Sequence, residues 1–197
     1  MTPKVRASYL QLILRQARNL PDGLGERMLE RMSPADLAAI EGAGVTEWLP
    51  FALHQRLQDA KNEVIDPERA AAVTRALVMV ALGTPILGGF VTNVLHLLGQ
   101  DPGPAIRWLP RAFALVFRGA GRLETTVHPS ARTATVLLHD MPEEVARSRS
   151  FVESVSVAFS TVYPITGFEG ACRVASWEPD RGRATFEMTW AIPHRLR

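Results

Sequence analysis

The five histidines, the single cysteine and Tyr163 are the side chains of this sequence considered for chemistry. The histidines have no metal-binding spacing, since neither His-x-x-x-His nor His-Glu-x-x-His occurs among positions 54, 96, 128, 139 and 194. The lone cysteine excludes an internal disulfide and a cysteine-rich metal site. An enzyme would need polar groups brought together from distant positions, and its candidates are His96, His128, Tyr163 and Cys172.

Known catalytic signatures do not occur in the chain. His139 and Asp140 are adjacent, but Asp140 with Glu143 three residues on has the pattern of a helix N-cap. Cys172 alternates with Val174 in an expected strand, which predicts a buried structural thiol. There is no P-loop, no Gly-x-Ser-x-Gly elbow and no dinucleotide-binding fingerprint. The sequence therefore favours a protein that is not an enzyme.

Helical periodicity dominates the first part of the chain. Ser33 and Asp66 are expected N-caps, each followed by a proline in the first helical turn. The sequence predicts helices over 9–20, 24–32, from 33 to about 41, 50–62, 66–82 and 86–98, and helical material up to about 117.

From residue 120 the period changes from helix to strand. Hairpins are predicted from strands 123–128 with 132–138 and 170–177 with 183–190, and an amphipathic helix runs between them from about 140 to 163. This order predicts an α+β fold, a helical N-terminal half followed by a strand-strand-helix-strand-strand antiparallel sheet half. We expect a single domain over 1–197, with a helical lobe at about 1–118 and an α/β lobe at about 119–197. The helix should cover one sheet face, and the helical lobe or a ligand could pack on the other.

Charge and hydropathy limit the partners. The net charge is +2 with no basic run, so nucleic-acid binding is not expected. Residues 76–100 contain no charged side chain, but Pro85 and several glycines interrupt them, which predicts two buried helices rather than a membrane span. The N-terminus has no signal-peptide pattern. With a single cysteine, these features suggest a cytoplasmic protein.

Trp-Leu-Pro occurs twice, at 48–50 and 108–110. The flanking residues do not match, so we interpret both copies as one way of anchoring the chain before a helix. Several aromatic residues, with two glycines, a histidine and the cysteine, could either belong to the core or line a ligand pocket between the lobes. The candidates for the pocket are Trp48, Gly88, Gly89, His96, Trp108, Phe159, Tyr163, Cys172 and Trp190.

Residues 7–60 carry a family resemblance. The stretches SYLQLILRQ, LGERMLERMSPADLAAIE and GVTEWLPFALHQRLQDA, with the closing strand ATFEMTW, resemble a paralogous family of myxobacterial proteins of about this length. That family is distantly similar to the haem–nitric-oxide-binding and vinyl-reductase-like sensor superfamily. The resemblance implies a helical half and an antiparallel sheet half around an internal ligand cavity, and a regulatory or ligand-sensing role.

Haem binding can be compared with this sequence residue by residue. Haem–nitric-oxide-binding domains use a helical proximal histidine, and His96 has a suitable place for it. They also hold the propionates with Tyr-x-Ser-x-Arg, whereas here His128 takes the place of the tyrosine before Ser130 and Arg132. This departure leaves no cofactor as the expectation, with haem as the alternative.

The leading hypothesis is a non-catalytic, cytoplasmic regulatory domain that binds a small apolar ligand or a protein partner. One alternative is a structural interaction module with a solid core, either monomeric or a homodimer. The other alternative is an enzyme with an unrecognised site.

Overall fold

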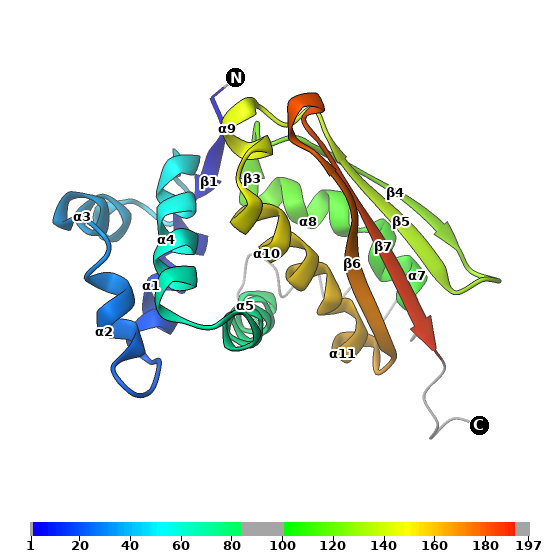
Figure 1. Ribbon diagram of the computed structural model, residues 1–197, viewed down its shortest axis with the longest axis horizontal. Coiled ribbons are helices and arrows are strands. Elements are labelled where there is room, and N and C mark those ends of the chain that lie inside the picture. The colour runs from blue at the N-terminus through cyan, green and yellow to red at the C-terminus, as the bar shows by residue number, and fades with distance from the viewer. Residues whose placement is uncertain (1, 84–100, 192–197) are drawn as a thin grey trace.

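The computed structural model describes residues 2–83 and 101–191, which form a mixed α and β architecture (Figure 1). Helices dominate the N-terminal half and antiparallel strands dominate the C-terminal half, so the predicted α+β class is confirmed. The predicted helix over 86–98 lies outside the described residues. The N-terminal helices are α1 (Ala7–Arg18), α2 (Leu24–Leu29), α3 (Pro34–Gly42), α4 (Phe51–Val64) and α5 (Pro67–Leu82).

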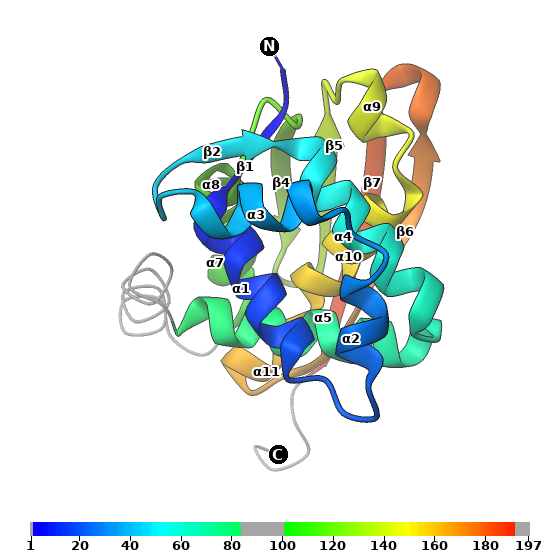
Figure 2. The ribbon, with the colours of Figure 1, turned by 90° about the vertical axis from the view of Figure 1, so that its left-hand side faces the viewer.

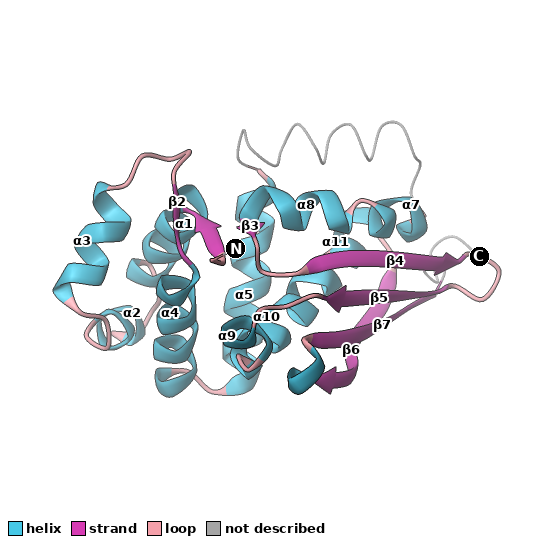
Figure 3. Ribbon diagram, turned by 90° about the horizontal axis from the view of Figure 1, so that it is seen from above, coloured by secondary structure: helices cyan, strands magenta, loops and turns pink. Residues whose placement is uncertain are grey.

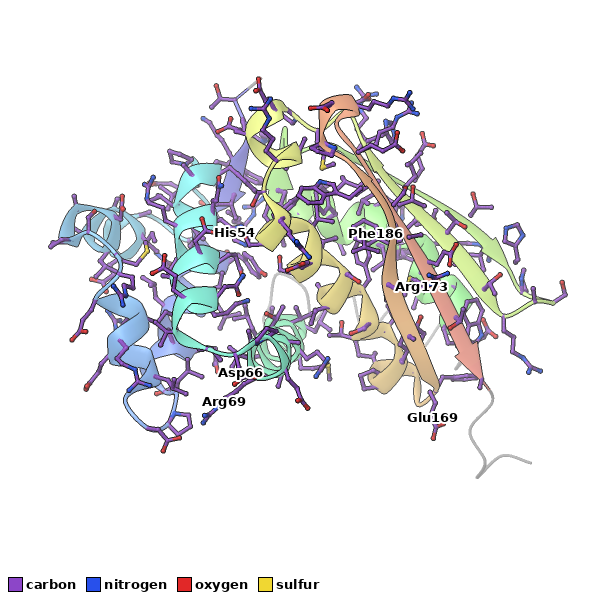
Figure 4. The ribbon with its side chains drawn as sticks, in the orientation of Figure 1. His54, Asp66, Arg69, Glu169, Arg173 and Phe186 are labelled. Atoms are coloured by element: carbon purple, nitrogen blue, oxygen red, sulfur yellow. The ribbon has the colours of Figure 1, made fainter. Side chains whose placement is uncertain are left out.

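Two of these helices begin at the caps that the sequence predicted. The Ser33 hydroxyl accepts the Asp36 N–H at 3.1 Å at the start of α3. The Asp66 carboxylate accepts the Arg69 N–H at 2.9 Å at the start of α5, and Figure 4 labels both residues. Each cap satisfies an N–H that has no partner within the first helical turn.

A four-stranded antiparallel sheet forms the C-terminal half, and both predicted hairpins are present. Its strands are β4 (Arg122–His128), β5 (Thr133–His139), β6 (Glu169–Glu178) and β7 (Arg183–Ala191). Their order across the sheet is β4-β5-β7-β6, which Figure 3 shows from above. The last strand thus lies inside the sheet, where Phe186 pairs with Val136 on one side and Val174 on the other.

Helices cover one face of this sheet. Helix α10 (Arg149–Ser160) packs on β6 and β7, while α7 (Pro102–Arg107) and α8 (Leu109–Val116) pack on β4. The Phe159 ring of α10 meets the Phe186 ring edge to face, with centroids 5.2 Å apart.

None of the described helices of the N-terminal half packs on the opposite sheet face. Helices α4 and α5 pack on the other side of α10, so α10 lies between them and the sheet (Figure 1). Figure 2 looks from the helical lobe toward the sheet and shows α1 to α4 in front. The uncovered face carries exposed or half-buried polar side chains, including the ion pair of Arg173 and Glu187. The second face therefore faces outward, because polar residues alternate along its strands.

The predicted helix from about 140 to 163 is broken into three. They are α9 (Glu143–Ala146), α10 and α11 (Val162–Thr166). Asp140 is not the cap, because its φ of 55° puts it in the left-handed region and Pro142 takes the N-cap position of α9. Ser148 caps α10 instead, since its hydroxyl accepts the Phe151 N–H at 3.3 Å.

The two Trp-Leu-Pro copies adopt different structures. The first copy is strand β2 (Trp48–Pro50), which pairs with β1 (Lys4–Arg6) in a three-stranded sheet completed by β3 (Phe117–Arg118). The second copy starts helix α8, with Trp108 at the N-cap. Both copies lead into a helix, as expected, since Pro50 is the N-cap of α4 and Pro110 lies in the first turn of α8. The backbone differs between them, because the first copy pairs with a distant strand and the second is already helical.

The described residues contain no helix long and apolar enough to cross a membrane. Most of the uncharged stretch 76–100 lies outside them.

Candidate functional site

An apolar cavity of about 140 Å³ lies where α1 and α5 meet α8 and α10. Five segments contribute most of its wall: α1, the end of α5, the start of β3, α8, and α10 with α11. The lining residues are Tyr9, Val78, Ala81, Leu82, Ala105, Leu109, Ala112, Phe113, Val116, Phe117, Val155, Ala158, Phe159, Thr161, Val162 and Ile165.

Small side chains on facing helices leave this space open. Ala81 comes from α5, Ala112 from α8 and Ala158 from α10, and all three line the cavity. Larger side chains such as Phe113 and Phe159 also line it. Because protein interiors are otherwise packed to crystal-like density, a space of this size is a distinct structural feature.

The cavity wall offers hydrocarbon almost everywhere. The Thr161 hydroxyl already donates to the Ala158 carbonyl at 2.6 Å. Burial raises the pKa of Tyr9 to about 12, so its phenol stays neutral at physiological pH. Apolar cavities of roughly 150 Å³ stay dry and take up molecules such as benzene or xenon. The geometry therefore suits one small, uncharged, apolar molecule.

A series of hydrogen-bonded, buried polar side chains lies behind one wall of the cavity. On α4, the His54 and Gln58 side chains are bonded through the His54 Nε2 and Gln58 Nε2 atoms at 3.2 Å. Lys61 Nζ donates to Gln58 Oε1 at 2.6 Å and to Thr74 Oγ1 at 2.8 Å. Among the described residues the His54 Nδ1 atom has no hydrogen-bond partner. Burial, with the nearby Lys61 charge, lowers the pKa of His54 to about 3, so this imidazole is neutral.

Aromatic rings surround His54 and separate it from the cavity. The rings of Tyr9, Phe117 and Phe151 lie 6.0, 5.4 and 5.9 Å from its ring, between centroids. Tyr9 and Phe117 belong to the cavity wall as well. His54 itself points from α4 into the boundary with α10 (Figure 4) and does not line the cavity.

The pocket candidates named from the sequence are scattered. Phe159 lines the cavity. Tyr163 and Cys172 lie together in a separate groove between α10, α11 and β6, where Tyr163 donates to the Ala171 carbonyl at 2.8 Å. His128 does not line that groove, and burial raises the pKa of Cys172 to about 11. A thiol that stays protonated is a poor nucleophile, so this groove lacks an activated cysteine.

The remaining candidates lie further away or outside the described chain. Trp190 is buried in the core under the sheet. Trp48 lies between the guanidinium groups of Arg6 and Arg118, each 4.4 Å from its ring centroid, on the small sheet. Trp108 lies at the start of α8 and is not among the lining residues. Gly88, Gly89 and His96 lie outside the described residues.

The fold is similar to that of solved H-NOX proteins. An Fe(II) unliganded H-NOX protein from K. algicida matches with a TM-score of 0.66 at 7% identity, over 96% of this chain and 98% of that chain. An S. oneidensis H-NOX protein in the Fe(II)NO ligation state gives 0.63 at 8% identity, over 95% and 99%. A mutant T. tengcongensis H-NOX protein gives 0.60 at 9% identity, over 96% and 99%.

At these identities the likeness establishes an H-NOX-like fold for this chain and does not by itself establish a function. No protein-family model and no curated protein sequence matches it. The haem–nitric-oxide-binding side of the resemblance is thus confirmed at the level of fold, while the myxobacterial family stays a prediction.

The described residues do not fit a haem. The segment from His128 to Arg132, which matches part of the propionate-binding motif, is exposed at the tip of the β4–β5 hairpin and contributes nothing to the cavity wall. Neither histidine nor arginine is among the lining side chains. No group of three metal-binding side chains occurs in the described ranges. A haem would bring two propionates and an iron, and the described residues of this wall provide neither a cation nor an imidazole for them.

Proposed function

We propose that the chain is a non-catalytic sensor-like domain that binds a small apolar molecule directly in its cavity. The observation that carries the proposal is the cavity wall, which is hydrocarbon apart from Tyr9 and a satisfied Thr161 hydroxyl. The H-NOX-like fold supports a sensor role, since neighbours with this fold include a protein solved with Fe(II)NO. A cytoplasmic location is part of the proposal.

Ligand binding would act through the packing of α1 and α5 against α8 and α10. Tyr9 of α1 and Ala81 of α5 line one side, and Phe113 of α8 and Phe159 of α10 line the other. A ligand that fills the space adds contacts to both pairs of helices at once. It would therefore favour the arrangement in which α5 packs against α10. A protein partner or a second copy of the chain would bind preferentially to that arrangement.

Native mass spectrometry with an absorbance scan, before and after addition of haemin and of benzene, tests the proposal. We expect no stoichiometric Soret band after gel filtration, and we expect benzene to raise the melting temperature. A Soret band of one haem per chain that survives gel filtration would replace the proposal with haem-based sensing. A protein that takes up neither haemin nor benzene would favour the interaction module with a solid core.

A further inference from the structure

Lys61 is a buried lysine that has no counter-charge among the described residues. Its side chain lies on α4 and the residue is 7% exposed. The Nζ atom donates to two neutral acceptors, the Gln58 amide oxygen and the Thr74 hydroxyl. An ammonium group has three N–H donors, so one remains without a partner among the described residues.

The acidic side chains near Lys61 are engaged elsewhere. Glu153 of α10 binds Arg149 at 2.7 Å, and Asp59 of α4 accepts from the Ser150 hydroxyl at 2.9 Å. Among the described residues no carboxylate lies within 4.0 Å of Lys61 Nζ. Buried charges in proteins are normally paired, because the loss of hydration is costly. Burial lowers the pKa of Lys61 to about 8, which leaves most of the amine protonated at neutral pH.

A second cleft, of about 240 Å³, opens beside this ammonium group. It lies between the end of α4, the start of α5 and α10, and it is separate from the apolar cavity. Its lining includes Lys61, the exposed Asn62, and Glu153, whose carboxylate is paired with Arg149. Ile65, Ala70 and Val157 supply an aliphatic surface.

The other polar groups of the cleft are poor donors to an anion. The Thr74 hydroxyl donates to the Ala70 carbonyl at 2.9 Å, and the Ser154 hydroxyl donates to the Phe151 carbonyl at 2.8 Å. The Ser150 hydroxyl donates to Asp59. Lys61 and Asn62 are therefore the side chains that can meet one small anion, and the surface beside them suits a short hydrocarbon chain.

We infer that this cleft binds a short-chain aliphatic carboxylate, with the carboxylate on Lys61 and Asn62 and the chain against Ile65, Ala70 and Val157. The carboxylate supplies the counter-charge that the buried ammonium lacks, through a charge-assisted hydrogen bond. Desolvation of both groups in the cleft strengthens their attraction relative to water. A neutral amide of the same size offers no such charge and should bind more weakly.

The chain contains Lys4 and Lys61 as its lysines, which allows a direct test on the intact protein. Lysine-selective isotope labelling gives one side-chain NMR signal for each, and butyrate is titrated in at neutral pH with butyramide as the uncharged match. We expect saturable movement of the Lys61 signal with butyrate, no movement of the exposed Lys4 signal, and binding of butyramide at least about tenfold weaker.

Variants separate a specific site from a general salt effect. Lys61→Met keeps most of the length of the side chain without its charge and should weaken butyrate binding by at least about tenfold. Asn62→Ala should weaken it less. Lys4→Met is the matched control and should bind butyrate like the wild type. A Lys61 signal that does not move when butyrate is added to the wild type would overturn the proposal. Equal movement of that signal with butyramide would also overturn it, as would undiminished butyrate binding by a folded Lys61→Met variant.

Discussion

The rings of Tyr9 and Phe117 meet edge to face with their centroids 6.0 Å apart. Both rings line the apolar cavity, and both also contact the His54 ring. Tyr9 comes from α1 and Phe117 from β3, so this contact joins the first helix to the end of the helical lobe. A ligand that moves either ring would also change the packing around a buried, neutral histidine.

His54 should make the protein sensitive to acid. Since its folded pKa is lowered from 6.5 to about 3, the unfolded chain binds a proton between these values that the folded chain does not. The stabilisation is fully present above pH 6.5 and is lost as the pH falls toward 3, by about 1.4 kcal/mol per pH unit.

Urea unfolding at a series of pH values measures this slope. His54→Leu should remove the His54 contribution to the pH dependence of the free energy of unfolding. His128→Leu, at an exposed hairpin position, should retain the wild-type slope. A His54→Leu variant with the full wild-type acid slope would show that His54 is not the responsible group.

Gly25 should tolerate no side chain. A Cβ atom at this position would lie 1.9 Å from the Ala17 carbonyl oxygen, because α2 approaches α1 closely there. We expect Gly25→Ala to lower the free energy of unfolding by about 1–3 kcal/mol. Gly42 is the control, since its Cβ would meet nothing within 4 Å at the end of α3. Gly42→Ala should be neutral or stabilise by up to about 1 kcal/mol in the same denaturant titration, and equal losses in both variants would contradict the account.

Cys172 should react slowly with alkylating reagents. Burial raises its pKa to about 11, although the Ser156 hydroxyl, 3.6 Å from the sulfur, acts in the opposite direction. At pH 8 we expect alkylation by iodoacetamide at least about tenfold slower than in the urea-unfolded chain, because the thiolate is the reactive form. Ser156→Ala should slow the folded-state reaction further. Alkylation as fast as that of the unfolded chain would reopen the case for a catalytic cysteine.

Local sequence patterns correctly predicted the helix caps and the hairpins. The Ser33 and Asp66 caps, both hairpins and the inward face of β7 follow from spacing within about ten residues. The three-stranded sheet could not be found in this way. Its strands have two or three residues each, and Trp48 is extended because it pairs with Arg6, far away in the sequence.

The cavity was harder to predict than the fold. Its wall combines Tyr9, Ala112 and Phe159 with other residues from distant helices, and an apolar stripe has the same spacing whether it faces a solid core or a cavity. A relevant signal was the set of alanines on facing helices, but alanine is also the commonest choice for a helix interior. The hydrogen-bonded side chains of α4 had a clearer signal, since His54 and Lys61, seven residues apart, lie on the same helical face.

Benzene binding to three proteins tests the central claim most directly. Ala112 lines the cavity, while Ala114 on the same helix α8 is exposed and outside it. In the wild type and in Ala114→Leu, benzene at ten times its Kd should add about 1.4 kcal/mol of stability and raise the melting temperature by about 3–6 °C. In Ala112→Leu the added side chain occupies the space, and the shift should vanish. An equal shift in Ala112→Leu, or no shift in the wild type, would contradict the account.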